Sequence, residues 1–293
     1  MLTIGILSSG KLGFQTLQKL ISIYSIKFIL TDKQSTDIIA LAKEKQIPLY
    51  AGNPRNGKGF EMIKNIEVDV IASINYLFLI EKDIISHPTK LIFNIHGSLL
   101  PKYRGRTPHV WAIINGEKMT GITAHVVDEG CDTGKIIHQI EVPIGDEDTG
   151  AVILNKYELQ YFPLIEKVLN NLKSGDIKFK DQDHYKATYF GKRTPSDGQI
   201  DWDLTNEEIR DWVRAQAYPY PGAFTFYEKR KIIIDKVCPI DFPKHKLYQN
   251  GEIISSNPDV IIKTKNGALK LLSYREEKLT FIVGKRFKNE NWK

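Results

Sequence analysis

The sequence predicts an α/β fold, with a Rossmann-like, mainly parallel sheet domain followed by a small β-rich C-terminal domain. Short apolar runs alternate with amphipathic helical segments along the first 185 residues, and this alternation is typical of a doubly wound sheet. The remaining residues instead carry short β-like runs separated by polar turns such as Asn250–Gly251. A chain of 293 residues can hold one large domain, expected over 1–185, and a smaller one, expected over 186–293.

The first βα unit is expected at the N-terminus, where the apolar run Leu2–Leu7 precedes a glycine-containing turn and a helix over 14–23. The turn contains Gly10 and Gly13 but lacks the GxGxxG fingerprint, so it does not predict a dinucleotide cofactor. Its backbone amides and Lys11 suit a phosphate at the start of the helix, although a tight turn alone explains them equally well. Further strands and helices are expected over 27–30, 38–45, 68–73, 81–85, 91–93 and 121–127.

A long amphipathic helix over 151–172 is expected to pack back on this sheet, and Gly175 ends it. Residues 182–189 are interpreted as the linker between the two domains. In the second domain, Thr205 with Glu208 three residues later predicts a capped helix that runs to about residue 217. Short strands are expected after it, over 225–227, 231–237, 260–264 and 268–274.

The composition is that of an ordinary soluble globular protein, with 42% hydrophobic and 26% charged residues. The net charge of +6, from 41 basic and 35 acidic residues, suits an anionic substrate but is too mild to indicate nucleic-acid binding by itself. The two cysteines form no CxxC pattern, so neither a disulfide framework nor a metal site is expected. The absence of a charged leader and of an apolar run of ~20 residues predicts a cytoplasmic protein without a membrane span.

Three polar side chains follow strands of the predicted sheet, the place where open α/β sheets carry their sites. Asn94 and His96 follow the strand over 91–93, and Asp132 follows the strand over 121–127. Taken alone, each of these side chains could have a purely structural role, such as a hydrogen bond to a turn. Together, an amide and an imidazole can stabilise an oxyanion, while a carboxylate holds or charges the imidazole, as acyl transfer to an amine requires. The same trio serves other chemistries, so spacing alone does not decide the reaction.

The run Phe93–Pro101 resembles the signature of the N10-formyltetrahydrofolate-dependent formyltransferase family, together with Asp132-Thr133-Gly134 after the next expected strand. The resemblance is strong over residues 65 to 145 and covers the first domain in outline. It implies that Asn94, His96 and Asp132 are the catalytic trio. It also implies a folate pocket, although core packing is the alternative for its apolar members; the residues expected there are Phe78, Leu79, Ile80, Arg106 and Asp128.

Three further segments, 102–108, 189–195 and 218–224, are similar to the bacterial sugar N-formyltransferases of this family. That branch implies a nucleotide-linked aminodideoxy sugar as acceptor, such as dTDP-4-amino-4,6-dideoxyglucose or a 3-amino relative, for surface polysaccharide synthesis. A homodimer is expected, and no nucleic-acid or membrane partner. Surface or structural roles remain open for the residues expected to contact pyrophosphate, sugar or base, which are Lys11, Asn75, Tyr76, Lys192, Arg193, Tyr218 and Tyr220.

Two other functions compete with sugar formylation. Methionyl-tRNA formyltransferases also resemble this chain, but they carry a long basic insertion after the second strand, whereas residues 31–37 lead almost directly into the next helix here. A folate- or nucleotide-binding relative without catalysis is the second alternative. The presence of Asn94, His96 and Asp132 argues against it, since packing does not require all three.

Overall fold

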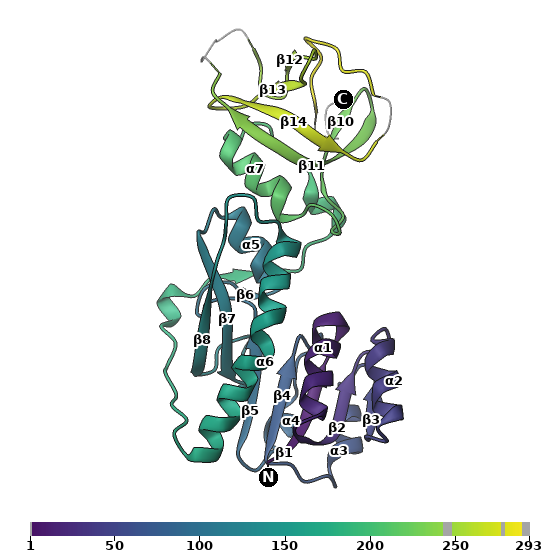
Figure 1. Cartoon of the computed structure of the whole chain (residues 1–293), viewed down its shortest axis with the longest axis vertical. Coiled ribbons are helices and arrows are strands. Elements are labelled where there is room, and N and C mark those ends of the chain that lie inside the picture. The colour runs from purple at the N-terminus through teal and green to yellow at the C-terminus, as the bar shows by residue number, and fades with distance from the viewer. Residues whose placement is uncertain (1, 243–247, 277–278, 289–293) are drawn as a thin grey trace. The chain divides into compact units, whose positions relative to one another are not determined.

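The computed structural model describes residues 2–242, 248–276 and 279–288. A seven-stranded sheet has the order β3-β2-β1-β4-β5-β7-β8, parallel from β3 to β5 and antiparallel between β5 and β7 (Figure 1). A five-stranded antiparallel sheet follows in the order β10-β11-β14-β13-β12. The predicted fold class, a mainly parallel α/β sheet followed by a small β-rich part, is confirmed.

The elements of the first half alternate as expected, and their bounds are β1 Thr3–Ser8, α1 Gly10–Ile21, β2 Ser25–Thr31, α2 Thr36–Glu44, β3 Leu49–Ala51, α3 Lys58–Ile63, β4 Val70–Ile74, α4 Lys82–Ile85, β5 Leu91–His96, β6 Arg104–Gly105, α5 Pro108–Ile114, β7 Met119–Val126 and β8 Ile136–Pro143. The later elements are α6 Gly150–Ser174, η1 His184–Lys186, β9 Tyr189–Phe190, η2 Pro195–Gly198, α7 Asn206–Ala215, β10 Ala223–Tyr227, β11 Arg230–Ile240, β12 Ile253–Ser255, β13 Ile261–Lys263 and β14 Ala268–Tyr274.

The parallel strands form the centre of the first core because apolar side chains cover both of their faces. Every residue of β4 is buried, as expected for a strand with layers on either side. Gly5 of β1 lies under the ring of Phe28, where a Cβ atom would come within 2.2 Å of the ring, so a glycine is required at this position. The helix α1 packs on β1, β2 and β4, and its buried residues include Leu12, Leu17 and Leu20.

The chain divides into two compact units that interleave along the sequence. The first comprises 1–105, 120–142 and 155–190, and the second comprises 106–119, 143–154 and 191–293. The helix α6 therefore contributes residues to both units. The division expected from the sequence, 1–185 and 186–293, remains a prediction.

The second unit has a core of its own between α7 and the antiparallel sheet. Trp202 stacks on Phe287 with ring centroids 5.4 Å apart, and both side chains are buried. The segment 143–154 is joined to α7 through Arg214, whose guanidinium pairs with Asp211 at 2.7 Å and donates to the carbonyl of Asp148 at 2.7 Å. The buried guanidinium thus has an anionic partner and backbone acceptors, so its charge is not isolated.

Several elements were not anticipated from the sequence. The strands β3, β8 and β12 and the helix α3 have no counterpart among the expected elements. Within the expected linker, β9 pairs in parallel with β6, joining Arg104 to Tyr189 and Gly105 to Phe190. Among the described residues, no helix is both long and apolar enough to cross a bilayer.

The capping box at the start of α7 should contribute measurably to the stability of the second unit. The Thr205 hydroxyl accepts from the amide of Glu208, and the Glu208 carboxylate accepts from the amide of Thr205 at 2.8 Å. We expect Thr205→Ala to lower the free energy of unfolding by about 1 kcal/mol, and Thr205→Ser to change it little. Trp111, Trp202 and Trp212 belong to segments of this unit, so urea unfolding followed by tryptophan fluorescence measures the difference. Equal stability of the two variants would contradict the prediction.

Candidate active site

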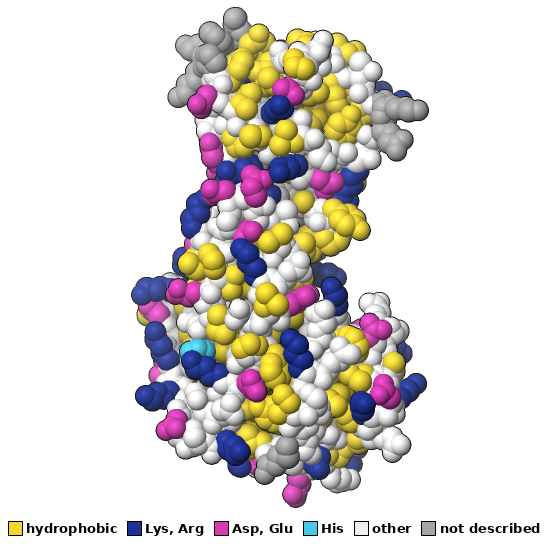
Figure 2. Space-filling view, viewed as in Figure 1, with side chains coloured by type: hydrophobic (Ala, Val, Ile, Leu, Met, Phe, Trp, Pro, Cys, Tyr) yellow, Lys and Arg dark blue, Asp and Glu magenta, His cyan; other side chains and the backbone are white. Residues whose placement is uncertain are grey.

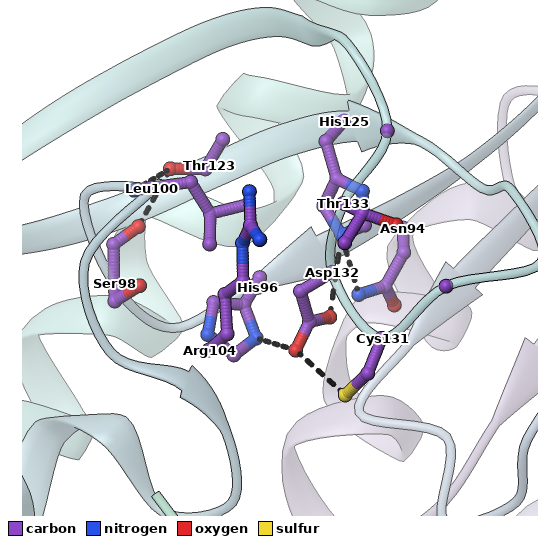
Figure 3. A network of polar contacts seen from close by, with 12 residues as sticks. Asn94, His96, Ser98, Leu100, Arg104, Thr123, His125, Cys131, Asp132 and Thr133 are labelled. Carbon is purple, nitrogen blue, oxygen red and sulfur yellow. Dashed lines mark hydrogen bonds and ion pairs between the residues drawn. The ribbon is translucent and has the colours of Figure 1, made fainter. Parts of the chain in front are cut away.

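The three predicted catalytic side chains lie together in the first unit (Figure 3). Asn94 and His96 stand on the same face of β5, because side chains two residues apart in a strand point the same way. In the antiparallel ladder, Asn94 is opposite His125 of β7 and His96 is opposite Thr123. Asp132 comes from the loop between β7 and β8, and its carboxylate lies 3.5 Å from a ring nitrogen of both His96 and His125.

The ring of His96 is buried and its two nitrogens have different partners. Nε2 lies 2.8 Å from the carbonyl oxygen of Tyr103. Because a carbonyl only accepts, Nε2 carries the proton of the neutral ring. Nδ1 faces Oδ2 of Asp132 at 3.5 Å and is the nitrogen that can gain or lose a proton. The site therefore presents a base at a defined atom, beside a carboxylate that stabilises its charged form.

Burial sets the charge state of His96. Burial lowers the pKa of this imidazole, whereas the Asp132 carboxylate and the Tyr103 carbonyl raise it, and the net result is a pKa below the usual value near 6.5. His125 and the guanidinium of Arg104 also act to lower the pKa. His96 is consequently neutral at pH 7 and can accept a proton.

The carboxylate of Asp132 remains ionised although it is largely buried. Burial acts to raise its pKa, but His96, His125 and the amide of Gly105 outweigh burial, so the pKa lies well below its usual range. The Gly105 amide donates to Oδ2 at 2.9 Å. The backbone of Asp132 is left-handed, with φ of 56°, which requires support from its surroundings. The sulfur of Cys131 also donates to Oδ2, at 3.6 Å.

His125 is a member of this site that the sequence analysis missed. Nδ1 of His125 donates to the carbonyl of Val126 at 2.8 Å, so Nε2 accepts from the side-chain amide of Asn94 at 3.2 Å. This bond turns the Asn94 amide nitrogen toward the site, where its second N–H can act as a donor. The signal was present in the alternation of β7, which places His125 on the same face as Thr123.

The residues expected in the folate pocket have mixed environments. Phe78 packs edge-on against Tyr76 with ring centroids 5.5 Å apart, and Ile80 packs against the sheet core. Leu79 is 61% exposed. Asp128 accepts from the amide of Gly130 and the hydroxyl of Thr133, and so closes its own loop. Their roles in folate binding remain predictions.

The residues expected to meet the substrate at the N-terminal turn lie beside one another. The side-chain amide of Asn75 donates to the carbonyl of Ser9 at 3.0 Å, next to the exposed Lys11. The amide of Gly10 already donates to the hydroxyl of Ser35 at 2.8 Å. The hydroxyl of Tyr76 is buried without a hydrogen-bond partner. A phosphate at this turn would thus meet Lys11 rather than the first helical amide.

The other predicted contacts, Arg106, Lys192, Arg193, Tyr218 and Tyr220, belong to the second unit. Arg193 lies between the rings of Trp111 and Trp212, at 4.9 and 4.5 Å from their centroids. The hydroxyl of Tyr220 is 2.9 Å from Nε2 of His109. Tyr218 is 76% exposed. Arg193 and Tyr220 therefore have structural contacts. The folate role expected for Arg106 and the substrate roles expected for the other four remain predictions.

The coupling between His96 and Asp132 can be measured directly. We expect Asp132→Asn to lower the pKa of His96 further, since the carboxylate acts to raise it. A pH titration of the histidine ring resonances by NMR gives this value. Asp128→Asn is the matched control, because an asparagine oxygen can still accept the two bonds that close the loop. A pKa of His96 that rises or stays constant in Asp132→Asn would rule out the coupling.

The chain matches two family models, one described as Formyl transferase, over residues 25–162, and one described as Formyl transferase, C-terminal domain, over residues 192–291. The expected family resemblance is thereby confirmed. Among the described residues, no group of three or more histidine, cysteine, aspartate or glutamate side chains could hold a metal ion.

Three solved structures illustrate the likeness. WlaRD, a sugar 3N-formyl transferase crystallised in the presence of dTDP and 5-N-formyl-THF, is 23% identical, with a TM-score of 0.73 over 95% of this chain and 99% of that one. An N-formyltransferase from Helicobacter canadensis, in complex with folinic acid and dTDP-3-aminofucose, is 19% identical, with a TM-score of 0.73 over 94% and 100% of the two chains.

A methionyl-tRNA formyltransferase from Clostridium thermocellum is 22% identical, with a TM-score of 0.58 over 90% of this chain and all of that one. At these identities the three structures establish a shared fold and leave the acceptor open. Together the two family models span most of the sequence, so the chain belongs to the formyl transferase family.

Proposed function

We propose that the protein transfers the formyl group of N10-formyltetrahydrofolate to the amine of a nucleotide-linked aminodideoxy sugar. The observation that carries the proposal is the buried pair of His96 and Asp132, with Nδ1 of the imidazole facing the carboxylate and the Asn94 amide beside it. Formyl transfer needs a base for the amine proton and a donor for the oxyanion. This arrangement provides both at fixed atoms.

Each residue then has one role. The Asn94 N–H that His125 leaves available donates to the oxygen of the formyl group as negative charge develops on it. Nδ1 of His96 accepts the proton that the attacking amine loses, and the Asp132 carboxylate stabilises the resulting imidazolium. Return of that proton to the departing nitrogen of tetrahydrofolate restores neutral His96. The formyl carbon has by then exchanged one carbon–nitrogen bond for another.

Two observations favour a nucleotide sugar over a tRNA as the acceptor. The connection from β2 to α2 is short and carries no long basic insertion, and Asp32 closes it by accepting from the hydroxyl and amide of Ser35. On the face shown in Figure 2, Lys and Arg side chains are interspersed with Asp and Glu. A tRNA would favour a continuous basic stripe.

The proposal extends to the identity of the amino sugar, the use of the product and the oligomeric state. The relative from Helicobacter canadensis was solved with dTDP-3-aminofucose, which supports a dTDP-linked 3-amino sugar beside the 4-amino sugar expected from the sequence. Use of the product in surface polysaccharide synthesis and assembly into a homodimer remain predictions.

Removal of the Asn94 amide should impair catalysis without unfolding the protein. We expect Asn94→Ala to lower kcat by about 10²- to 10³-fold, because a donor to the oxyanion is lost. The measurement is release of tetrahydrofolate with the amino sugar that the wild-type protein accepts. Asn170→Ala, on an exposed position of α6, is the matched control and should keep wild-type turnover. Turnover of Asn94→Ala close to that of Asn170→Ala would remove Asn94 from the mechanism.

A panel of acceptors tests the proposed substrate class. The panel contains dTDP-, UDP- and GDP-linked amino sugars and methionyl-tRNA, each supplied with N10-formyltetrahydrofolate. We expect one amino sugar to give tetrahydrofolate and a product heavier by a formyl group. Turnover confined to methionyl-tRNA, with binding that weakens steeply as salt rises, would instead establish the alternative acceptor. Folate binding without turnover of any acceptor would favour a non-catalytic relative.

A further inference from the structure

A single buried side chain, Gln182, bridges the loop of Asp132 to a buried cation. Gln182 is 6% exposed although it lies in the segment expected to be a linker. Its Nε2 donates to the carbonyl of Asp132 at 2.9 Å and to that of Gly134 at 2.6 Å. Its Oε1 accepts from Nε and Nη2 of Arg104, at 3.3 and 2.6 Å. Both N–H groups of the Gln182 amide therefore donate to the backbone around Asp132.

The cation at the other end of this bridge is costly to bury. Arg104 is fully buried, and in addition to Gln182 its guanidinium contacts Nδ1 of His184 and the hydroxyl of Tyr189. These acceptors are neutral, and within the described part of the chain no carboxylate pairs with Arg104. A buried cation without an anionic partner destabilises a fold compared with an apolar side chain of similar size. Stability alone therefore does not account for the arrangement.

The backbone that Gln182 holds is the one that orients the catalytic carboxylate. Asp132 is left-handed, a conformation that a non-glycine residue adopts only when its surroundings hold it. The two carbonyls bonded by Gln182 lie on either side of Thr133, so they define the peptide planes that follow Asp132. Fixing these planes fixes the direction in which the carboxylate points toward His96.

The same segment also holds the partner of His96. The hydroxyl of Thr188 accepts from the amide of Tyr103 at 2.8 Å, and the ring of Phe190 stacks on that of Tyr103 at 5.2 Å. The carbonyl of Tyr103 is the group to which Nε2 of His96 donates. Residues 182–190 thus support both members of the catalytic pair, Asp132 through Gln182 and His96 through Tyr103.

We propose that Gln182 is a positioning residue, which anchors the backbone of Asp132 to Arg104 so that the carboxylate stays opposite Nδ1 of His96. Its effect on rate rests on the proposed function. Its effect on the geometry of the pair does not, because the interaction between Asp132 and His96 can be measured in the protein without substrates.

The test uses Gln182→Glu, which removes the N–H donors of the side chain and keeps an oxygen acceptor. A glutamate still accepts from Arg104, so the buried cation keeps its partner, but it cannot donate to the carbonyls of Asp132 and Gly134. We expect kcat to fall about 10- to 100-fold, because the pair moves away from its working geometry. KM for the formyl donor and for the amine should stay within about threefold, since a loss confined to the transition state does not weaken binding.

A second measurement corrects for the effect of the new glutamate's charge on the pKa of His96. The change in the pKa of His96 caused by Asp132→Asn is measured by NMR in the wild-type and in the Gln182→Glu background, as a double-mutant cycle. We expect Asp132→Asn to move the pKa of His96 by less than about half as much when Gln182 is replaced. An undiminished shift would overturn the proposal. Gln182→Met, which is uncharged and of similar size, takes the same place in the cycle if Gln182→Glu does not fold.

The matched control is Gln139→Glu on β8. Nε2 of Gln139 also donates twice, to the carbonyl of Leu100 at 3.0 Å and to the hydroxyl of Thr123 at 2.9 Å, so the chemical change is the same. This variant should keep the coupling between Asp132 and His96, and equal losses of coupling in both variants would overturn the proposal. Wild-type protein that formylates no acceptor, combined with lost coupling in Gln182→Glu, would defeat the proposed function but support the positioning role.

Discussion

The candidate active site depends on one hydrogen bond, in which Nε2 of His96 donates to the main-chain carbonyl of Tyr103. The bond assigns the ring proton to Nε2 and leaves Nδ1 as the only nitrogen able to gain one. It also holds the ring with Nδ1 toward Asp132. Because Tyr103 is bonded to Thr188, 85 positions further along the chain, the protonation of a side chain on β5 is set by long-range packing. The chemistry of the site is therefore a property of the fold of the first unit.

The meeting of His96 and Asp132 is not a simple consequence of strand ends at one edge of a sheet. Since β7 runs antiparallel to β5, the two strands end in opposite directions. The loop after β7 must turn back for Asp132 to reach the end of β5, and the left-handed backbone at Asp132 is part of that turn. Gly134 allows it, because a Cβ there would lie 1.9 Å from the carbonyl oxygen of Val126.

Local patterns in the sequence were sufficient to predict the parallel core, the capping box of α7 and the grouping of Asn94, His96 and Asp132 in one candidate site. Apolar alternation and the formyltransferase motif are both carried by neighbouring residues, so they can be recognised without tertiary contacts. The support of the site could not be recognised in this way. The strand β9 has two residues and exists through its pairing with β6. Arg104 and Gln182 are polar residues of a kind usually exposed. They are buried through their bonds to each other, those of Gln182 to the Asp132 loop and those of Arg104 to His184 and Tyr189.

The electrostatics of the site tie its function to a loss of stability in acid. Burial keeps the pKa of His96 below 6.5, so below that pH the unfolded chain binds a proton that the folded chain does not. The pKa of Asp132 is also depressed in the folded protein, where His96, His125 and Gly105 outweigh burial, and its contribution is lost only as the pH falls below the usual aspartate value near 3.9. Where His96 is neutral and Asp132 is ionised, Asp132 stabilises the fold and His96 no longer destabilises it. Formyl transfer to an amine requires those same charge states, so the pH range that favours the folded site is the range in which it can accept a proton.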